Sequence, residues 1–219
     1  MPDGRLFIGT RRYSSWSLRG WLAVHLAELD VEEIVIPLTG HGATEAVKRV
    51  SPSGLVPYLE HRASHVWETL AIAEYCAEIS PALWPADPVA RAHARSIAAE
   101  MHAGFGALRR ALPMNLGRTE PGGARTPEVL ADIARIEAIW AGTREHFGGG
   151  PYLFGPAFTA ADAMYAPVVT RLLTYRPEIT AASADYCEAV RAHPLIAAWY
   201  DAAAAEPEEW RLPDYESVR

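Results

Sequence analysis

The stretch SPALWPADP, residues 80–88, contains three prolines. A helix can hardly continue through it, because each proline lacks a backbone N–H donor and clashes with the preceding turn. We therefore predict a linker at 80–87, between a first domain at 1–79 and a second at 88–219. A chain of 219 residues is long enough for one large or two small domains.

The part before the linker alternates between strand and helix patterns. Short apolar runs indicate strands, and apolar residues that recur every three or four positions indicate helices. The predicted order is strand, helix, strand, weak helix, strand, strand, helix, which makes a small α/β domain. The strands are expected at Leu6–Gly9, Glu33–Leu38, Val56–Glu60 and His65–Trp67, and the helices at 18–29, 44–50 and 70–79.

After the linker the sequence predicts only helices. Asp87 and Pro88 suit the N-cap and first position of a helix, which we expect to run unbroken from Val89 to Arg110. The sequence TAAD at 159–162 fits an N-terminal capping pattern, in which Thr159 is the N-cap and acidic Asp162 is the third residue of the helix. Further helices are expected at 126–146, from 159 to near 177, at 183–192 and at 194–205, so the second domain is all α.

Composition and charge exclude several classes of protein. The chain is 50% hydrophobic, which excludes a disordered or low-complexity protein. Its net charge of −7 argues against nucleic acid or an anionic membrane as partner. Cys76 and Cys187 lie far apart without metal-ligand spacing, so we expect no disulfide framework, no metal site and a reducing, cytoplasmic setting. We also expect no signal peptide and no membrane span.

Three polar turns are expected at one edge of the small sheet. The serines of SSWS, residues 14–17, lie in the first strand-to-helix turn, where free helix N–H groups can bind a ligand. Val56 and Pro57 precede a strand, and Glu68 and Thr69 precede a helix. Each turn alone also fits a purely structural role, since Ser and Glu are common at helix N-termini. Their convergence favours a binding site.

The motifs around these turns resemble those of one family. YSSWSLR (13–19), SPSGLVPYL (51–59) and ETLAI (68–72), followed by the proline-rich linker and a helical domain, are similar to the cytosolic glutathione transferases. The resemblance covers the whole chain. The SSxSxR pattern is most similar to the serine-type zeta and tau classes, of which the zeta class includes maleylacetoacetate isomerases. Trp16 stands where zeta enzymes have cysteine, and Leu55 replaces a residue that is often polar.

The resemblance implies a thioredoxin-like first domain that binds glutathione. Ser14, with Ser15 as its competitor, would donate a hydrogen bond to the glutathione sulfur, while Ser17 would cap the helix. Val56 would pair its backbone with the cysteinyl part of glutathione across a cis Pro57; an ordinary trans turn is the alternative.

The resemblance also assigns the two ends of glutathione. Glu68 and Thr69 would bind the α-amino and α-carboxylate groups of the γ-glutamyl end, and helix capping is the alternative. His41 would lie near the glycyl carboxylate, or else in a solvated loop. Arg11, Arg12 and Arg109 could meet an anionic co-substrate, or else be ordinary surface arginines. Three apolar residues could line a second-substrate site or belong to the core: Met101, Phe105 and Leu108.

The implied function is that of a glutathione S-transferase, in which the glutathione thiolate attacks a small electrophile for conjugation, isomerisation or reduction. Glutathione is then a co-substrate, and neither a metal nor another cofactor is needed. The resemblance also implies a homodimer and a role in detoxification. A single chain would otherwise leave apolar surface exposed near Tyr58 and Leu59 and on the long helices. The alternative is a non-catalytic glutathione-binding or protein-interaction module on the same fold. A thiol-disulfide oxidoreductase is disfavoured, since residues 14–17 contain no cysteine.

Overall fold

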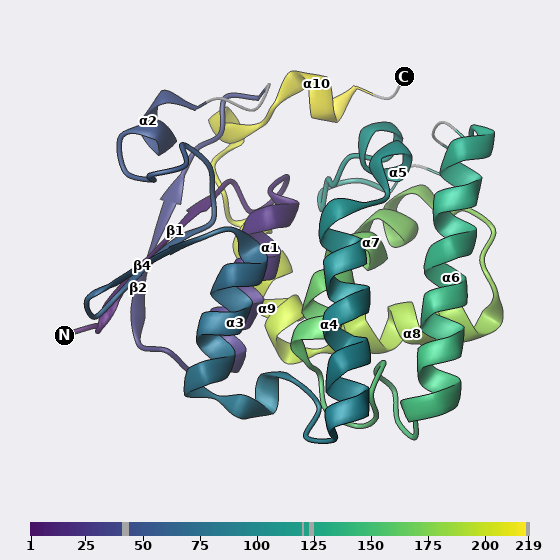
Figure 1. Ribbon diagram of the computed structural model, residues 1–219. Coiled ribbons are helices and arrows are strands. Elements are labelled where there is room, and N and C mark those ends of the chain that lie inside the picture. Colours follow the sequence, from purple (N-terminus) through teal and green to yellow (C-terminus); the bar gives the residue numbers. More distant parts are fainter. Residues whose placement is uncertain (41–43, 120, 123–124, 218–219) are drawn as a thin grey trace.

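The computed structural model describes residues 1–40, 44–119, 121–122 and 125–217. The chain forms an α/β half and a helical half that lie side by side (Figure 1). The elements of the α/β half are β1 (Gly4–Gly9), α1 (Ser15–Leu26), β2 (Val31–Ile36), α2 (Glu45–Lys48), β3 (Tyr58–His61), β4 (Ser64–Trp67) and α3 (Thr69–Ile79).

The α/β half is built on a four-stranded mixed sheet with the order β2-β1-β3-β4. β1 pairs in parallel with β2 and antiparallel with β3, where Leu6 lies opposite Leu59. β4 pairs antiparallel with β3 at the other edge. Leu6 and Ile8 of β1 are fully buried in a cluster with Leu18 of α1 and Ile72 of α3. Helices α1 and α3 thus pack against the sheet, as expected for the predicted α/β domain.

The helical half follows a short 3-10 helix in the proline-rich stretch. Within the described ranges, no helix combines the length and apolarity that a membrane span needs. The elements are η1 (Pro81–Leu83), α4 (Pro88–Ala103), α5 (Gly106–Ala111), α6 (Pro127–Phe147), α7 (Ala160–Tyr175), α8 (Ala181–Ala192), α9 (Pro194–Ala204), η2 (Glu208–Trp210) and α10 (Pro213–Glu216).

The predicted unbroken helix from Val89 to Arg110 is wrong. Gly104 leaves the helical conformation, and Phe105 adopts a left-handed one with φ of 60°. A Cβ atom on Gly104 would lie 2.8 Å from the Glu100 carbonyl oxygen, so the chain needs glycine at this break. The break gives α5 its own start, separate from α4.

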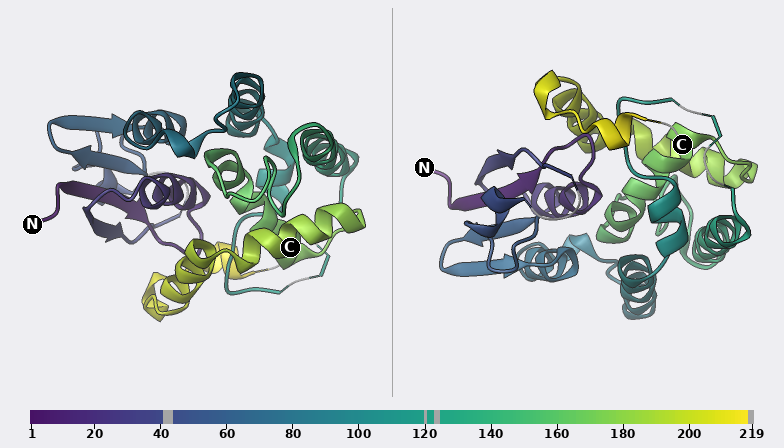
Figure 2. Two further views of the ribbon diagram at one scale, coloured as in Figure 1. Left: turned by 90° about the horizontal axis from the view of Figure 1, so that it is seen from below. Right: turned by 90° about the horizontal axis from the view of Figure 1, so that it is seen from above.

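One continuous core joins the two halves. α1 packs against α3 of the first half and against α7 of the second. The two views of Figure 2 agree that α1 lies between the sheet and the helical half. Leu22 of α1 and Met164 of α7, both buried, belong to the same cluster. The N-terminus of α1 therefore lies at the junction of the halves.

Glu33 of β2 ties the sheet to α1 and to the loop that precedes it. Its carboxylate contacts the Arg11 guanidinium at 2.5 Å and the His25 imidazole at 3.0 Å. Burial favours the protonated acid, but the hydrogen bonds from His25 and Arg11 and the Arg11 charge outweigh it. They lower the pKa of Glu33 to about 2.

This lowered pKa predicts a pH-dependent contribution to stability. Because the pKa is lower in the folded state than in the unfolded chain, the carboxylate stabilises the fold above about pH 4.3 and loses that effect as the pH falls towards about 2. We expect Glu33→Gln to lower the Tm near neutral pH and the difference from the unaltered protein to shrink towards about pH 3. Glu32→Gln, an exposed neighbour, is the control. A Tm difference for Glu33→Gln that does not change with pH would contradict this account.

Candidate active site

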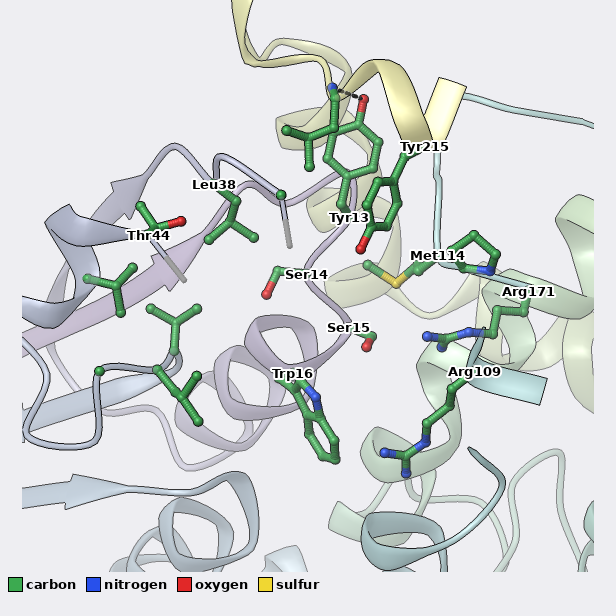
Figure 3. A pocket seen from close by; sticks show the side chains of 17 residues that line it. Tyr13, Ser14, Ser15, Trp16, Leu38, Thr44, Arg109, Met114, Arg171 and Tyr215 are labelled. Carbon is green, nitrogen blue, oxygen red and sulfur yellow. Dashed lines mark hydrogen bonds between the residues drawn. The ribbon is translucent and has the colours of Figure 1, made fainter. Parts of the chain in front are cut away.

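A hollow lies between the two halves, at the N-terminal end of α1 (Figure 3). Its volume of about 310 Å³ falls within the usual range for small-molecule sites, about 300 to 1,000 Å³. The turn at residues 13–17 is here called the serine turn, and its residues 13–16 line the hollow. The α/β half supplies one wall, including Leu38 and Val56, and the helical half supplies the other, including Arg109 and Arg171.

Ser14 is the N-cap of α1 and is almost completely buried. Its Oγ accepts a hydrogen bond from the Ser17 N–H at 3.3 Å and donates one to the Ser17 Oγ at 2.7 Å. The Ser17 Oγ in turn accepts a hydrogen bond from the Gly9 N–H at 2.9 Å. The expectation that Ser17 caps the helix is therefore wrong. Ser14 fills that role because it precedes the first helical residue, whereas Ser17 faces β1.

Ser15 is the second serine that lines the hollow. Among the described residues, no group forms a hydrogen bond with its hydroxyl. Its backbone carbonyl accepts a hydrogen bond from Arg19 at 3.4 Å. Figure 3 shows Ser14 and Ser15 between the two walls of the hollow. The first turn of α1 contains no acidic residue, so its free N–H groups favour an anion in front of them.

Tyr13 cannot readily supply or release a proton at this site. Its hydroxyl donates to the Glu216 carboxylate and accepts a hydrogen bond from the Leu212 N–H at 3.2 Å. Burial and the Glu216 contact raise the pKa of Tyr13 to about 12. Tyr13 therefore holds the C-terminal segment in place over the hollow, where Tyr215 packs against its ring.

The Val56-Pro57 peptide bond is cis, as the resemblance to the glutathione transferases implies. Helix α1 approaches it closely at Gly20, where a Cβ atom would lie 2.6 Å from the Pro57 ring. Glycine at this position therefore allows the serine turn and the segment before β3 to lie side by side. The Val56 backbone is not part of the sheet ladder formed by β3, which begins at Tyr58.

Glu68 and Thr69 line a second hollow that adjoins the first. The two hollows share Trp16, Leu55 and Val56 in their walls. The three predicted turns are thus brought together in pairs, the serine turn with Val56 and Val56 with Glu68. His41, the fourth predicted contact, lies outside the described residues.

Glu68 has an exposed carboxylate on a left-handed backbone, with φ of 69°. The imidazole Nε2 of His102, on α4, lies 3.5 Å from the Glu68 carboxylate. Burial lowers the pKa of His102, although the Glu68 charge opposes this shift. Near neutral pH the imidazole is then uncharged, and the Glu68 charge remains available to a ligand. Backbone strain of this kind is often found at binding sites.

The helical wall contains residues that the sequence analysis missed. Arg171 of α7 and Leu212 and Tyr215 of the C-terminal segment line the first hollow beside Arg109. Arg171 is a charged residue within an apolar run, and that signal could have singled it out. The three apolar residues considered for this wall, Met101, Phe105 and Leu108, are buried in the core instead. Within the described part of the chain, no group of three metal-ligating side chains could hold a metal ion.

Two family models match the chain. The model described as "Glutathione S-transferase, N-terminal domain" matches residues 13–79, and its C-terminal counterpart matches residues 90–202. The chain belongs to the glutathione S-transferase family. The predicted fold, an α/β thioredoxin-like domain followed by an all-α domain, and the predicted class of enzyme are confirmed.

This transferase is similar to proteins from animals and bacteria. It is 29% identical to a probable maleylacetoacetate isomerase of Caenorhabditis elegans over 165 residues, which cover 73% of this chain and 74% of the relative. Its structure resembles that of a glutathione transferase homolog from Burkholderia with bound glutathione (TM-score 0.70, 22% identity, 93% of this chain and 100% of that chain). It also resembles a theta class enzyme from Xanthomonas axonopodis pv. citri with glutathione bound (TM-score 0.65, 23% identity, 94% and 99%).

Proposed function

We propose that this transferase binds glutathione beside Val56 and activates its thiol at the serine turn. The observation that carries the proposal is the position of Ser14 and Ser15. They lie at the N-terminus of α1 and line, together with Val56 of the cis Val56-Pro57 bond, a hollow large enough for a small molecule. A backbone edge, hydroxyl donors and a helix N-terminus meet there, which is what an extended peptide with an ionised thiol requires.

Ser14 would donate a hydrogen bond to the sulfur after its hydroxyl hydrogen turns away from Ser17. Hydroxyl hydrogens rotate to suit their partners, so Ser17 can donate to Ser14 in place of the reverse. The Gly9 N–H, the Ser17 hydroxyl and the Ser14 hydroxyl would then form a chain of donors in one direction. Such chains strengthen each hydrogen bond. Ser15, whose hydroxyl has no bond to give up, is the competing donor.

These groups can supply the free energy needed for ionisation. A thiol has a pKa near 8.5, and lowering it by about two units requires roughly 2.7 kcal/mol. A hydrogen bond to a charged acceptor contributes about 1.5 to 3 kcal/mol, and a helix N-terminus about 0.3 to 1 kcal/mol. The thiolate then attacks an electrophilic carbon and forms an S–C bond, while the leaving group departs with the bonding electron pair.

A panel of electrophiles tests the proposed activity. Maleylacetoacetate belongs in the panel beside aryl halides and peroxides, because the relative from Caenorhabditis elegans is named for that isomerisation. Retention on a glutathione column together with turnover of at least one electrophile is the expected result. Retention without any turnover would favour a non-catalytic glutathione-binding module. The free, buried Cys76 and Cys187 fit a reducing compartment, so we propose that the enzyme is cytoplasmic. From the resemblance to the family we propose that it detoxifies electrophiles.

Glu68 and Thr69 would hold the γ-glutamyl end of glutathione. The Glu68 carboxylate would bind the α-ammonium, which lies far from the sulfur and changes little during the reaction. We expect Glu68→Ala to raise the glutathione KM about tenfold to hundredfold and to leave kcat nearly unchanged, as for loss of a charge-assisted hydrogen bond. Glu78→Ala, an exposed carboxylate of the same helix, is the control. An unchanged glutathione KM would remove Glu68 from the site.

We propose a homodimer, as the resemblance to the family implies, although the exposed apolar surface lies only partly where the sequence predicts it. Tyr58 and Leu59 are buried within the single chain, so they provide no apolar surface. Trp67, Ile79 and Val89 are exposed instead, near the two ends of α3 and at the start of α4. Light scattering at micromolar concentration is expected to give twice the 23.9 kDa mass of one chain, and a single 23.9 kDa species would contradict the proposal.

A further inference from the structure

Three arginines gather on the helical side of the serine turn. Arg19 and Arg171 are almost completely buried, and Arg109 is partly buried. Among the described residues, none of the three forms a salt bridge with a carboxylate. Asp132, whose charge acts on Arg109, is held by the Leu108 N–H at 2.9 Å. Three positively charged side chains thus share a buried region in which the described residues supply little negative charge.

The hydrogen bonds of these arginines go to backbone carbonyls and leave donors unused. Arg171 donates to the carbonyls of Leu112 and Pro167, both at 2.8 Å. The Arg109 Nη2 donates to the Met101 carbonyl and, at 3.1 Å, to the His102 carbonyl. The Arg109 Nε is buried without a hydrogen-bond partner in the described structure. Likewise, the Arg171 Nη2 has no hydrogen-bond acceptor among the described residues. A buried donor such as the Arg109 Nε normally has a partner, so this region offers hydrogen-bond donors to a further acceptor.

The electrostatics favour an anion as that acceptor. Burial, together with repulsion between Arg109 and Arg171, lowers the pKa of Arg171 to about 10, and the same repulsion acts on Arg19. Arg171 is still protonated near neutral pH. A bound anion would relieve the repulsion and occupy the unused donors. A planar carboxylate suits this role best, because a guanidinium can bind it through two parallel hydrogen bonds.

The position of Arg109 and Arg171 assigns the anion to a second substrate. Figure 3 shows both side chains on the helical side of Ser15 and Trp16, whereas Leu38 and Thr44 lie on the opposite side of Ser14. Glutathione, if held at Val56 and Glu68, occupies the α/β side. The Arg109 guanidinium lies 4.7 Å from the centre of the Trp16 ring, a cation-π contact that holds it beside the serine turn.

We propose that the electrophile of this enzyme carries a carboxylate, which Arg109 and Arg171 bind so that its reactive carbon faces the serine turn. This inference rests on the proposed function, since it names the substrate class for the same site. Arg109 and Arg171 are then binding residues for the second substrate, and Arg19 supports them from within the core through its bond to the Met164 carbonyl at 2.7 Å.

A matched pair of electrophiles tests the proposal on the unaltered protein. The glutathione thiolate displaces chloride from 4-chloro-3-nitrobenzoate or from the neutral 4-chloro-3-nitrobenzamide; an S–C bond forms, chloride leaves with the electron pair, and the thiol proton goes to solvent. We expect kcat/KM to be about tenfold to hundredfold higher for the acid, after correction for the uncatalysed rates. Equal values for acid and amide would overturn the proposal.

Variants then test whether Arg109 and Arg171 cause the preference for the acid over the amide. Arg109→Met and Arg171→Met are expected to lower kcat/KM about tenfold to hundredfold more for the acid than for the amide. Arg110→Met, which removes an exposed charge next to Arg109, should alter neither. An equal rise in the glutathione KM and the acid KM would mean that the arginines serve glutathione, and would overturn the proposal. Because Arg171 is buried, thermal melting is needed to show whether each variant is folded. Arg171→Lys, which keeps the positive charge, is the second variant at this position.

A binding experiment separates this inference from the proposed function. Calorimetry with the unreactive pair 3-nitrobenzoate and 3-nitrobenzamide needs neither glutathione nor turnover. Tighter binding of the acid, lost in Arg109→Met, would support the anion site even if no electrophile is turned over. Equal binding of acid and amide would overturn it even if conjugation of neutral electrophiles is fast.

Discussion

Ser14→Ala is expected to lower kcat/KM near pH 7 about tenfold to hundredfold, because the thiolate loses a hydrogen bond to a charged acceptor. The glutathione KM should change little, since Val56 and Glu68 would still hold the tripeptide. The substitution also removes the N-cap of α1, which costs about 1 kcal/mol of stability. Assays well below the Tm keep that loss of stability apart from the loss of rate. The pH profile of kcat should shift upwards by one to two units.

Two further variants complete the comparison. Ser96→Ala removes an exposed serine of α4 that bonds only the Ala92 carbonyl, so it should leave the rate unchanged. Ser15→Ala should have a smaller effect than Ser14→Ala. If Ser15→Ala alone shifts the pH profile, Ser15 is the donor. If neither variant does, the serine turn acts through its helix N-terminus alone, and the proposed role of Ser14 is wrong.

Asp162→Ala is expected to lower the free energy of unfolding by about 3 to 5 kcal/mol. The carboxylate is fully buried and forms the predicted capping box with Thr159 at the start of α7. It accepts hydrogen bonds from the Thr159 N–H and hydroxyl, both at 2.8 Å, from the Leu153 N–H at 3.0 Å and from the Tyr186 hydroxyl at 3.1 Å. Alanine would leave these buried donors without a partner, at about 1 to 3 kcal/mol each before relaxation.

Denaturant unfolding checks this prediction. Asp185→Ala removes an exposed carboxylate from α8 and should change the free energy of unfolding by less than about 0.5 kcal/mol. Asp162→Asn keeps the shape and one acceptor oxygen, and should fall between Asp162→Ala and the unaltered protein. A loss for Asp162→Ala no larger than that for Asp185→Ala would contradict a structural role for the capping box.

Features that depend on a few neighbouring residues could be predicted from the sequence. The capping box at 159–162 is one, because both partners lie within a single helical turn. The order of strands and helices is another, because apolar spacing reflects which face is buried. The break at Gly104 was missed because a single glycine within an apolar pattern is often tolerated in a helix. Here Phe105 is buried in the core, and the left-handed turn holds it there.

Only those features of the site that belong to a family motif could be predicted from the sequence. The cis Val56-Pro57 bond came from the resemblance, and the residues alone favoured a trans bond. The hydroxyl directions of Ser14 and Ser17 depend on Gly9, eight residues away on β1, so local spacing cannot give them. Arg109 of α5 and Arg171 of α7 come together only through the tertiary arrangement of the helical half, which the sequence pattern does not encode.

The most direct test of the central claim is the pKa of the glutathione thiol when bound to the unaltered enzyme. Thiolate absorbs in the ultraviolet, so a pH titration of the binary complex, with the protein alone as reference, gives this value without any second substrate. Activation at the serine turn predicts a pKa of about 6.5, two units below the value of about 8.5 for a free thiol. A bound thiol that titrates near 8.5 would contradict the account, whatever the enzyme is found to turn over.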